Sequence, residues 1–306
     1  MKRMPHFLGR IEPTPARSVL RFVLGAAVAA LVISMAPKVQ AQSDSFSDLE
    51  DTSNPTWTHL SGYVGSSGQT WDASSGAYRL TAVNNGLSGL GFVGSHVGAS
   101  YTDVRVSADI TSFVGPPAGA VFGVAARLNG NNALAALTGY AYAYEPFAAS
   151  GQGEMVLYRI GPSVSANDIG SQQVTLDPLK DYRFVLEIIG PNLHGQVFEI
   201  VGGGLVAERF ATDANYASGF SGVIAYSQNP VPPVDFTVDN FLAEASNQIH
   251  VTRLPNGQIQ LSWEGPGHLE EASEVTGPWN DYSPGGDVSP VVVNPDTPQR
   301  FFRVHQ

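Results

Sequence analysis

Few of the residue types and motifs that carry catalysis occur in this chain of 306 residues. It has no cysteine, which excludes a thiol nucleophile, a zinc–thiolate site and a disulfide framework. It also lacks a His-Glu-x-x-His motif, a Gly-x-Ser-x-Gly motif and a phosphate-binding glycine loop. The seven histidines share no metal-ligand spacing, so we expect them at the surface or at strand ends.

Hydrolysis of a glycosidic bond needs two carboxylates, one as acid and one as base, and alternate positions of one strand would place both on the same face. The sequence has no such alternating pair. Glu270 and Glu271 are adjacent, so in a strand they would point to opposite faces. A pair assembled from two strands, such as Glu145 with a second carboxylate, stays open. The sequence therefore favours a protein that is not an enzyme, with a divergent glycoside hydrolase as one alternative.

Arg127 lies in an apolar segment, residues 121–128, with the alternation of a strand. Phe122, Val124 and Leu128 belong to the bulkier of its two faces, which we expect in the core. Arg127 has the opposite parity. We therefore predict that it lies on an exposed face of a sheet.

A tyrosine stripe in residues 139–145 is the second candidate for ligand binding. Tyr140, Tyr142 and Tyr144 alternate with small residues and Glu145, so the stripe is either a sugar-stacking platform or, more commonly, core. Sugar sites pair an aromatic face with planar hydrogen-bonding groups. The candidate ligand-binding residues are Arg127, Glu145, Arg159 and Tyr144.

The elements that must position these residues are strands. From residue 43 to 245, short alternating or apolar runs recur between Gly, Asn, Asp, Ser and Pro, without a convincing helical period. Residues 69–72 and 77–83 flank Ser-Ser-Gly and predict a hairpin. About a dozen such strands predict an all-β, antiparallel two-sheet sandwich.

A second module is predicted for residues 247–306. A hairpin is indicated there by Pro-Asn-Gly at 255–257 between two strand-like runs. We expect four aromatic residues to dominate its small core: Trp263, Trp279, Phe301 and Phe302. The main sandwich would then occupy residues 42–246.

Residues 1–41 have the layout of a secretory signal peptide: a basic start, an apolar run over 22–36 and small residues before position 42. We therefore predict export, to the periplasm or outside the cell. Without this segment, 10 Lys and Arg stand against 26 Asp and Glu, a net charge of −16. Such a chain repels nucleic-acid phosphates and anionic lipids, so we expect neither as a partner, nor membrane insertion after cleavage.

Four segments carry a resemblance to a known family: 175–184, 194–200, 216–223 and 235–241. Their order, a strand tyrosine, a hairpin, a glycine-rich strand and a closing Asp-Asn strand, resembles the laminin-G/concanavalin A-like jelly-roll domains over roughly residues 44–244. The tail, with Leu-Glu-Glu-Ala-Ser at 269–273, resembles a fibronectin-III-like module of secreted bacterial proteins. The resemblance implies a β-sandwich for recognising carbohydrate or protein surfaces, frequently with a structural calcium ion.

The first and last strands of a jelly roll can lie side by side. Asp48 lies near the start of the first predicted strand and Asp239 lies within the last, so these two are the candidate calcium ligands. Asp44 or Asp51 would supply further oxygen ligands. The alternative is that both aspartates serve turns and strand ends.

The sequence as a whole predicts an exported recognition protein that binds polysaccharide or a cell-surface glycan through the face of a jelly-roll sheet. A structural or adhesive envelope protein without sugar affinity is the first alternative, and the divergent glycoside hydrolase is the second.

Overall fold

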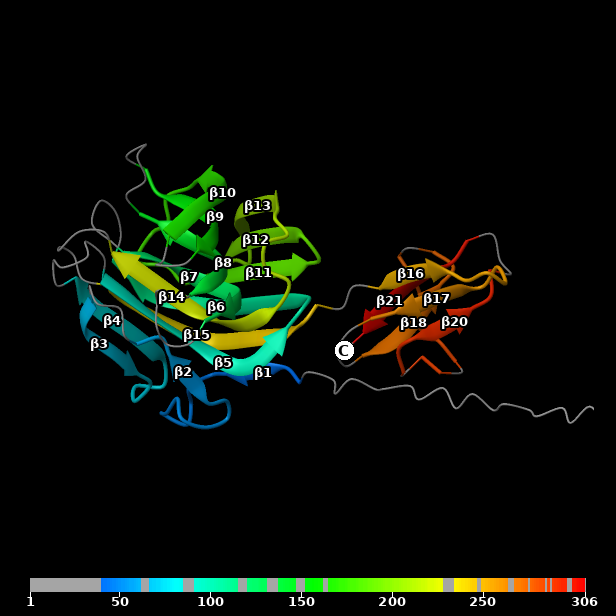
Figure 1. The fold of residues 1–306 in the computed structure, drawn as a ribbon, viewed down its shortest axis with the longest axis horizontal. Helices are drawn as coiled ribbons and strands as arrows, with labels where there is room; N and C mark the ends of the chain where they lie inside the picture. Colours follow the sequence, from blue (N-terminus) through cyan, green and yellow to red (C-terminus); the bar gives the residue numbers. More distant parts are fainter. Residues whose placement is uncertain are drawn as a thin grey trace, which may run out of the picture. The chain divides into compact units, whose positions relative to one another are not determined.

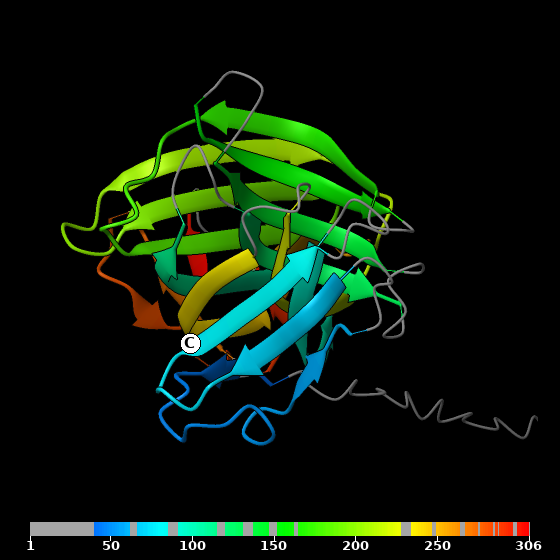
Figure 2. The ribbon, with the colours of Figure 1, turned by 90° about the vertical axis from the view of Figure 1, so that its left-hand side faces the viewer.

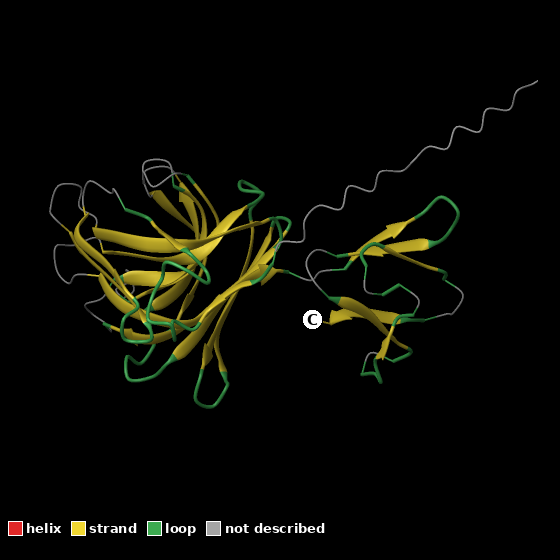
Figure 3. Cartoon of the chain, turned by 90° about the horizontal axis from the view of Figure 1, so that it is seen from below, coloured by secondary structure: helices red, strands yellow, loops and turns green. Residues whose placement is uncertain are grey.

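The computed structural model describes residues 40–61, 66–84, 91–114, 120–130, 137–146, 152–161, 165–227, 234–246, 249–263 and 267–305, the last without 275, 284, 287 and 296–298. Across these ranges the regular structure consists of strands, joined by loops and turns (Figure 3). No helix capable of crossing a membrane occurs in them. The predicted signal peptide lies outside the described residues, apart from its last two positions.

Sheet A has eight strands in the order β13-β12-β11-β6-β15-β4-β3, with β1 paired to β15 (Figure 1). Its strands are β1 (Gln42–Asp44), β3 (Ser66–Asp72), β4 (Tyr78–Asn84), β6 (Val104–Phe113), β11 (Tyr182–Ile189), β12 (Asn192–Glu199), β13 (Leu205–Thr212) and β15 (Val234–Ala245). The predicted hairpin is confirmed as β3 and β4.

Sheet B has seven strands in the order β10-β9-β8-β7-β14-β5-β2. Its strands are β2 (Trp57–His59), β5 (Gly91–Tyr101), β7 (Val121–Asn129), β8 (Thr138–Glu145), β9 (Glu154–Gly161), β10 (Ser165–Gln173) and β14 (Gly219–Ser227). Every pairing in both sheets is antiparallel, and the sheets stack as two layers (Figure 2). The predicted antiparallel two-sheet sandwich is confirmed.

The main core lies between the two sheets. Phe122 of sheet B stacks on Phe184 and Phe236 of sheet A, with ring centroids 5.9 and 5.6 Å apart. The tyrosine stripe also faces this core, where Tyr142 is fully buried. Gly195 on β12 makes room for it, because a Cβ there would lie 2.5 Å from the Tyr142 ring. The stripe is therefore core rather than a sugar platform.

The outer faces of the two sheets differ. Sheet B carries a second apolar cluster on its outer face, including Phe92, Val156, Tyr158 and Ile224, all buried. The outer face of sheet A is polar: Arg105, Glu187 and His194 are only partly buried. Of the two, sheet A thus has the face suited to a hydrophilic ligand.

Two three-stranded sheets follow in residues 250–305. One has the order β16-β17-β20 and the other β19-β18-β21. Their strands are β16 (His250–Arg253), β17 (Ile259–Ser262), β18 (His268–Ala272), β19 (Asn280–Asp281), β20 (Val291–Val293) and β21 (Phe301–His305). The predicted hairpin around Pro-Asn-Gly is confirmed as β16 and β17.

The core of these small sheets contains Trp263, as predicted, and Phe302 packs against it. The other two predicted core aromatics, Trp279 and Phe301, are not members of this cluster and are only partly buried. Trp279 instead lies under the guanidinium of Arg303, 4.5 Å from its Cζ. The other buried members of the cluster are aliphatic, and Tyr282 packs against it beside Phe302. The boundary near residue 247 stays a prediction.

Candidate functional site

Arg127 is not on an exposed sheet face, so that prediction is wrong. Its side chain is 2% exposed and lies 3.3 Å from the carboxylate of Asp103. The guanidinium also donates to the carbonyls of Thr102, Gly190 and Tyr216 at 2.7 to 2.9 Å. The buried guanidinium thereby holds three loops together, so Arg127 stabilises the fold and is not available to a ligand.

A β-bulge explains why alternation fails at Arg127. The pairing of β7 with β8 shifts between Ala126 and Asn129, and Arg127 has a φ of 50°. A residue inserted in this way reverses the parity of the residues beyond it. Leu128, expected in the main core, accordingly joins the apolar cluster outside sheet B.

Tyr144 and Glu145 lie on opposite faces of β8. Tyr144 is fully buried in the main core, where its hydroxyl accepts a hydrogen bond from the Leu176 N–H at 3.2 Å. Glu145 is partly buried on the outer face of sheet B and accepts a hydrogen bond from the Tyr158 hydroxyl at 2.6 Å. Burial raises the pKa of Tyr158, so this hydroxyl remains a donor.

Arg159 pairs with Asp213, with 2.7 Å between Nη1 and Oδ2, and its side chain is 33% exposed. Asp213 also accepts hydrogen bonds from the Tyr140 hydroxyl and from Asn215. Burial alone would raise the pKa of Asp213, but these hydrogen bonds lower it to about 2. Arg159 lies on β9 and is paired with Tyr140 near the start of β8, whereas Glu145 is the last residue of β8. The four predicted ligand-binding residues therefore do not form one site.

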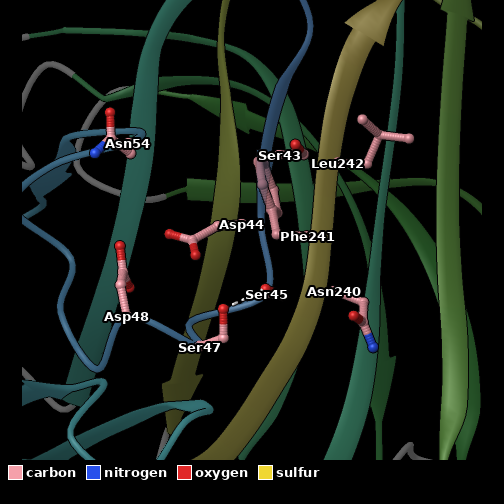
Figure 4. Close-up of a pocket in the computed structure, with 9 residues that line it drawn as sticks. All are labelled: Ser43, Asp44, Ser45, Ser47, Asp48, Asn54, Asn240, Phe241 and Leu242. Carbon is pink, nitrogen blue, oxygen red and sulfur yellow. Dashed lines mark hydrogen bonds between the residues drawn. The ribbon is translucent and has the colours of Figure 1, made fainter.

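The first and last strands of the sandwich do lie side by side, as predicted, because Asp44 on β1 is paired with Phe241 on β15. A hollow of about 360 Å³ opens beside this pair. Figure 4 shows the residues that line it: Ser43, Asp44, Ser45, Ser47, Asp48, Asn54, Asn240, Phe241 and Leu242. Asp239 does not line the hollow, and its neighbour Asn240 does.

The residues of this hollow suit a hard cation in kind, since most of their donors are oxygen atoms. Asp44 already accepts hydrogen bonds at both oxygens, from the Phe46 N–H at 2.7 Å and from Trp57 Nε1 at 2.8 Å. Asp48 is exposed and is thus the carboxylate that would hold the ion, whereas Asn240 lies across β15 from it (Figure 4) and donates from Nδ2 to Asp109 Oδ2 at 3.0 Å. Within the described ranges, the only group of three His, Asp or Glu donors within 4.8 Å of one another lies elsewhere and excludes Asp48 and Asp239.

A polar row crosses the outer face of sheet A. The register places one residue of each strand directly opposite the next, and directly opposite residues share a face. From β15 to β13, this cross-strand row consists of Glu244, Arg105, Glu187, His194 and Phe210. Five strands at the usual spacing make it about 19 Å long.

The row ends in an exposed aromatic ring. Phe210 is 62% exposed, and one of its faces stacks on His194, with centroids 4.1 Å apart and planes within 12°. Glu208, two residues away on β13, accepts hydrogen bonds from Gln196 and contacts His194 Nε2 at 2.8 Å. The ring is therefore held in place by its neighbours while it remains open to solvent.

At the other end of the row, one arginine lies between two carboxylates. Arg105 Nη1 lies 3.6 Å from Glu244 Oε1, and its side chain is 39% exposed. Burial raises the pKa of Glu244, and Arg105 partly offsets that effect. The Glu187 carboxylate accepts a hydrogen bond from the Ser246 hydroxyl at 2.7 Å. Planar hydrogen-bonding groups and an aromatic face thus occur along a single line.

Sequence reasoning missed this row because its members lie on five strands, from residue 105 to 244. Arg105, Glu187, His194 and Phe210 lie in segments predicted as strands, but the spacing within one strand does not show which residue of another strand lies opposite. The one local signal is an aromatic residue in the polar run Glu-Arg-Phe at 208–210.

No family model matches the sequence, and no curated protein matches it. Solved structures with a similar fold include the carbohydrate-binding module CBM66 from Bacillus subtilis, at 17% identity and a TM-score of 0.41, over 62% of this chain and 92% of that chain. The basic winged bean lectin with Tn-antigen is similar at 12% identity and a TM-score of 0.47, over 67% and 98%. The exoplasmic/lumenal domain of VIP36, in a Ca2+/Man3GlcNAc-bound form, is similar at 9% and 0.48, over 70% and 91%. At these identities the likeness describes the fold alone.

Proposed function

We propose that this protein is an exported glycan-binding protein, and that the cross-strand row of sheet A is its binding surface. The observation that carries the proposal is the Phe210 ring, 62% exposed and stacked on His194 at the end of a polar row. An exposed aromatic ring next to carboxylates and an arginine offers a sugar both an apolar contact and directed hydrogen bonds. The surplus of acidic residues favours a neutral or basic glycan over an anionic one.

The test is a polysaccharide array probed with residues 42–306, with wild type beside Phe210→Ala. We expect binding to a defined glycan class and at least a tenfold loss in the variant. Leu179→Ala is the matched control, because Leu179 is an exposed apolar residue, 92% exposed, that is not part of the row. If wild type binds and Phe210→Ala binds equally well, the row is not the site.

Calcium enters the same experiment, since the hollow beside β1 and β15 is proposed to take a structural ion. The array is repeated with calcium and with a chelator, and Asp48→Asn is added. If chelation and Asp48→Asn both weaken binding, the hollow supports the glycan site. Silence of the folded wild type on every glycan would favour the structural or adhesive alternative.

The hydrolase alternative has one specific feature in its favour. Two carboxylates of the row, Glu187 and Glu244, flank Arg105 on neighbouring strands. Any glycan that binds is therefore also incubated with the protein and analysed for products. Turnover that is abolished by Glu187→Gln would establish an enzyme, whereas binding without products supports recognition alone.

A further inference from the structure

Three potential metal ligands converge on the surface of the small sheet β19-β18-β21. The donor atoms of His268, Glu270 and Asp281 all lie within 4.8 Å of one another. His268 Nε2 is 3.1 Å from Asp281 Oδ1 and 4.0 Å from Glu270 Oε1. This set is not used by the proposed glycan site, which lies in the sandwich.

Strand geometry accounts for the convergence. His268 and Glu270 are two residues apart on β18, so they point to the same face of the sheet. Asp281 on β19 is directly opposite Glu270 and shares that face. The spacing along the chain, with Asp281 eleven residues beyond Glu270, hides this from a search for ligand motifs.

The central ligand is also positioned by its neighbours. Glu270 is 8% exposed, and its Oε2 accepts a hydrogen bond from Arg303 Nε, while its Oε1 is the oxygen nearer His268. Arg303 in turn lies over the ring of Trp279. A ligand carboxylate oriented by a hydrogen bond at its other oxygen is the usual arrangement at protein metal sites.

We propose that His268, Glu270 and Asp281 form a binding site for a borderline transition-metal ion of the Zn2+ type. One imidazole nitrogen and two carboxylate oxygens are ligands that zinc accepts at 2.0 to 2.2 Å, which puts tetrahedral ligands about 3.4 Å apart. The observed separations of 3.1 and 4.0 Å need only small side-chain movements to reach that value. The fourth position is left for water or a further ligand.

A bound ion would stabilise the two small sheets. Their buried core cluster has five members, and β19 is two residues long. Small modules without disulfides are commonly stabilised by a metal, and this chain has no cysteine. An ion bound by both β18 and β19 would hold the short strand to the sheet.

The experiment is calorimetric titration of untagged protein, residues 42–306, with Zn2+, because an affinity tag of histidines would itself bind the metal. We expect one zinc ion per chain at this site, and at least a tenfold weaker binding in His268→Ala and in Asp281→Asn. Both side chains are partly or largely exposed, at 34% and 80%, so the variants should fold, which their thermal unfolding without metal checks. His59→Gln is the control, since His59 also contacts a carboxylate, Asp51, at 2.6 Å, but no third His, Asp or Glu donor joins them among the residues that the structure describes.

A second measurement uses stability. Zn2+ should raise the thermal unfolding temperature of wild type and of His59→Gln, and it should leave His268→Ala unchanged. The proposal is overturned if wild type binds no zinc, or if both ligand variants bind it as tightly as wild type. Displacement of zinc by an equal concentration of Ca2+ would also overturn it, because a site with an imidazole ligand prefers zinc.

Discussion

Two regions of the sandwich contain the same residue types, but one is buried and stabilises the fold while the other is exposed on a sheet face. The Arg127 cluster, which consists of Arg127, Asp103, Tyr140 and Asp213, is closed to solvent, and its polar atoms are bonded to loops of the same chain. The cross-strand row also combines an arginine, carboxylates and an aromatic ring, but it runs over an open sheet face. An arginine beside a carboxylate therefore does not identify a binding site. Whether the pair is reachable depends on the local course of the strand.

The comparison predicts that the two regions respond oppositely to mutation. Changes in the Arg127 cluster should cost stability, because they leave buried polar groups without partners. Changes in the row should cost ligand binding and leave stability nearly unchanged.

The largest effect is expected for Arg127→Ala. It removes the cation that Asp103 and three backbone carbonyls share, and breaking a buried pair in this way costs about 3–5 kcal/mol. Urea unfolding measures the loss. Arg79→Ala is the control, because Arg79 makes a two-hydrogen-bond pair with Asp235 on the outer face of sheet A with its side chain 56% exposed, and we expect it within about 1 kcal/mol of wild type. Equal losses in both variants would contradict the distinction.

Tyrosine-to-phenylalanine changes in the stripe should have opposite signs. Tyr140→Phe removes the hydroxyl bonded to Asp213 at 2.6 Å and should cost about 1–3 kcal/mol. The Tyr142 hydroxyl is buried and has no hydrogen-bond partner among the described residues. Its removal in Tyr142→Phe should therefore be neutral or stabilising by up to about 1 kcal/mol. Paired urea unfolding curves decide the signs, and a destabilised Tyr142→Phe would show that this hydroxyl has a partner.

Acid should weaken the Arg127 cluster through Asp213. Its pKa is about 2 in the folded chain, below the roughly 3.9 of an unfolded aspartate. A lowered pKa contributes stability that is fully present above about pH 4 and is lost as the pH falls towards 2. The free energy of unfolding of wild type should accordingly fall more steeply over this range than that of Asp213→Asn. Parallel profiles would mean that Asp213 does not contribute.

The smallest effect on stability is expected for Phe210→Ala. The ring is 62% exposed, so its loss should change the free energy of unfolding by no more than about 0.5 kcal/mol. Thermal unfolding measures the effect on stability, and the glycan array measures the effect on binding. A strongly destabilised variant would place Phe210 with the structural residues instead.

Prediction from the sequence succeeded where strands are regular and apolar. The hairpin β3–β4 and the hairpin β16–β17 were found from their turns. Among the strands of more than three residues, two were not predicted: β5 is rich in Gly and Ser, and β10 is polar. Both form because they pair with neighbouring strands, β5 with β14 and β2, and β10 with β9, and local composition does not reveal such pairings.

The sequence by itself determined the all-β class, the two-sheet sandwich and the core tyrosine stripe, because period-two alternation and turn residues act locally. Only the tertiary structure decided which polar residues meet. A one-residue bulge turned Arg127 inward, strand order aligned Glu244, Arg105, Glu187, His194 and Phe210, and strand register brought Asp281 to His268. These placements depend on pairings between strands far apart in the chain, and the spacing of residues along a single strand carries no information about them.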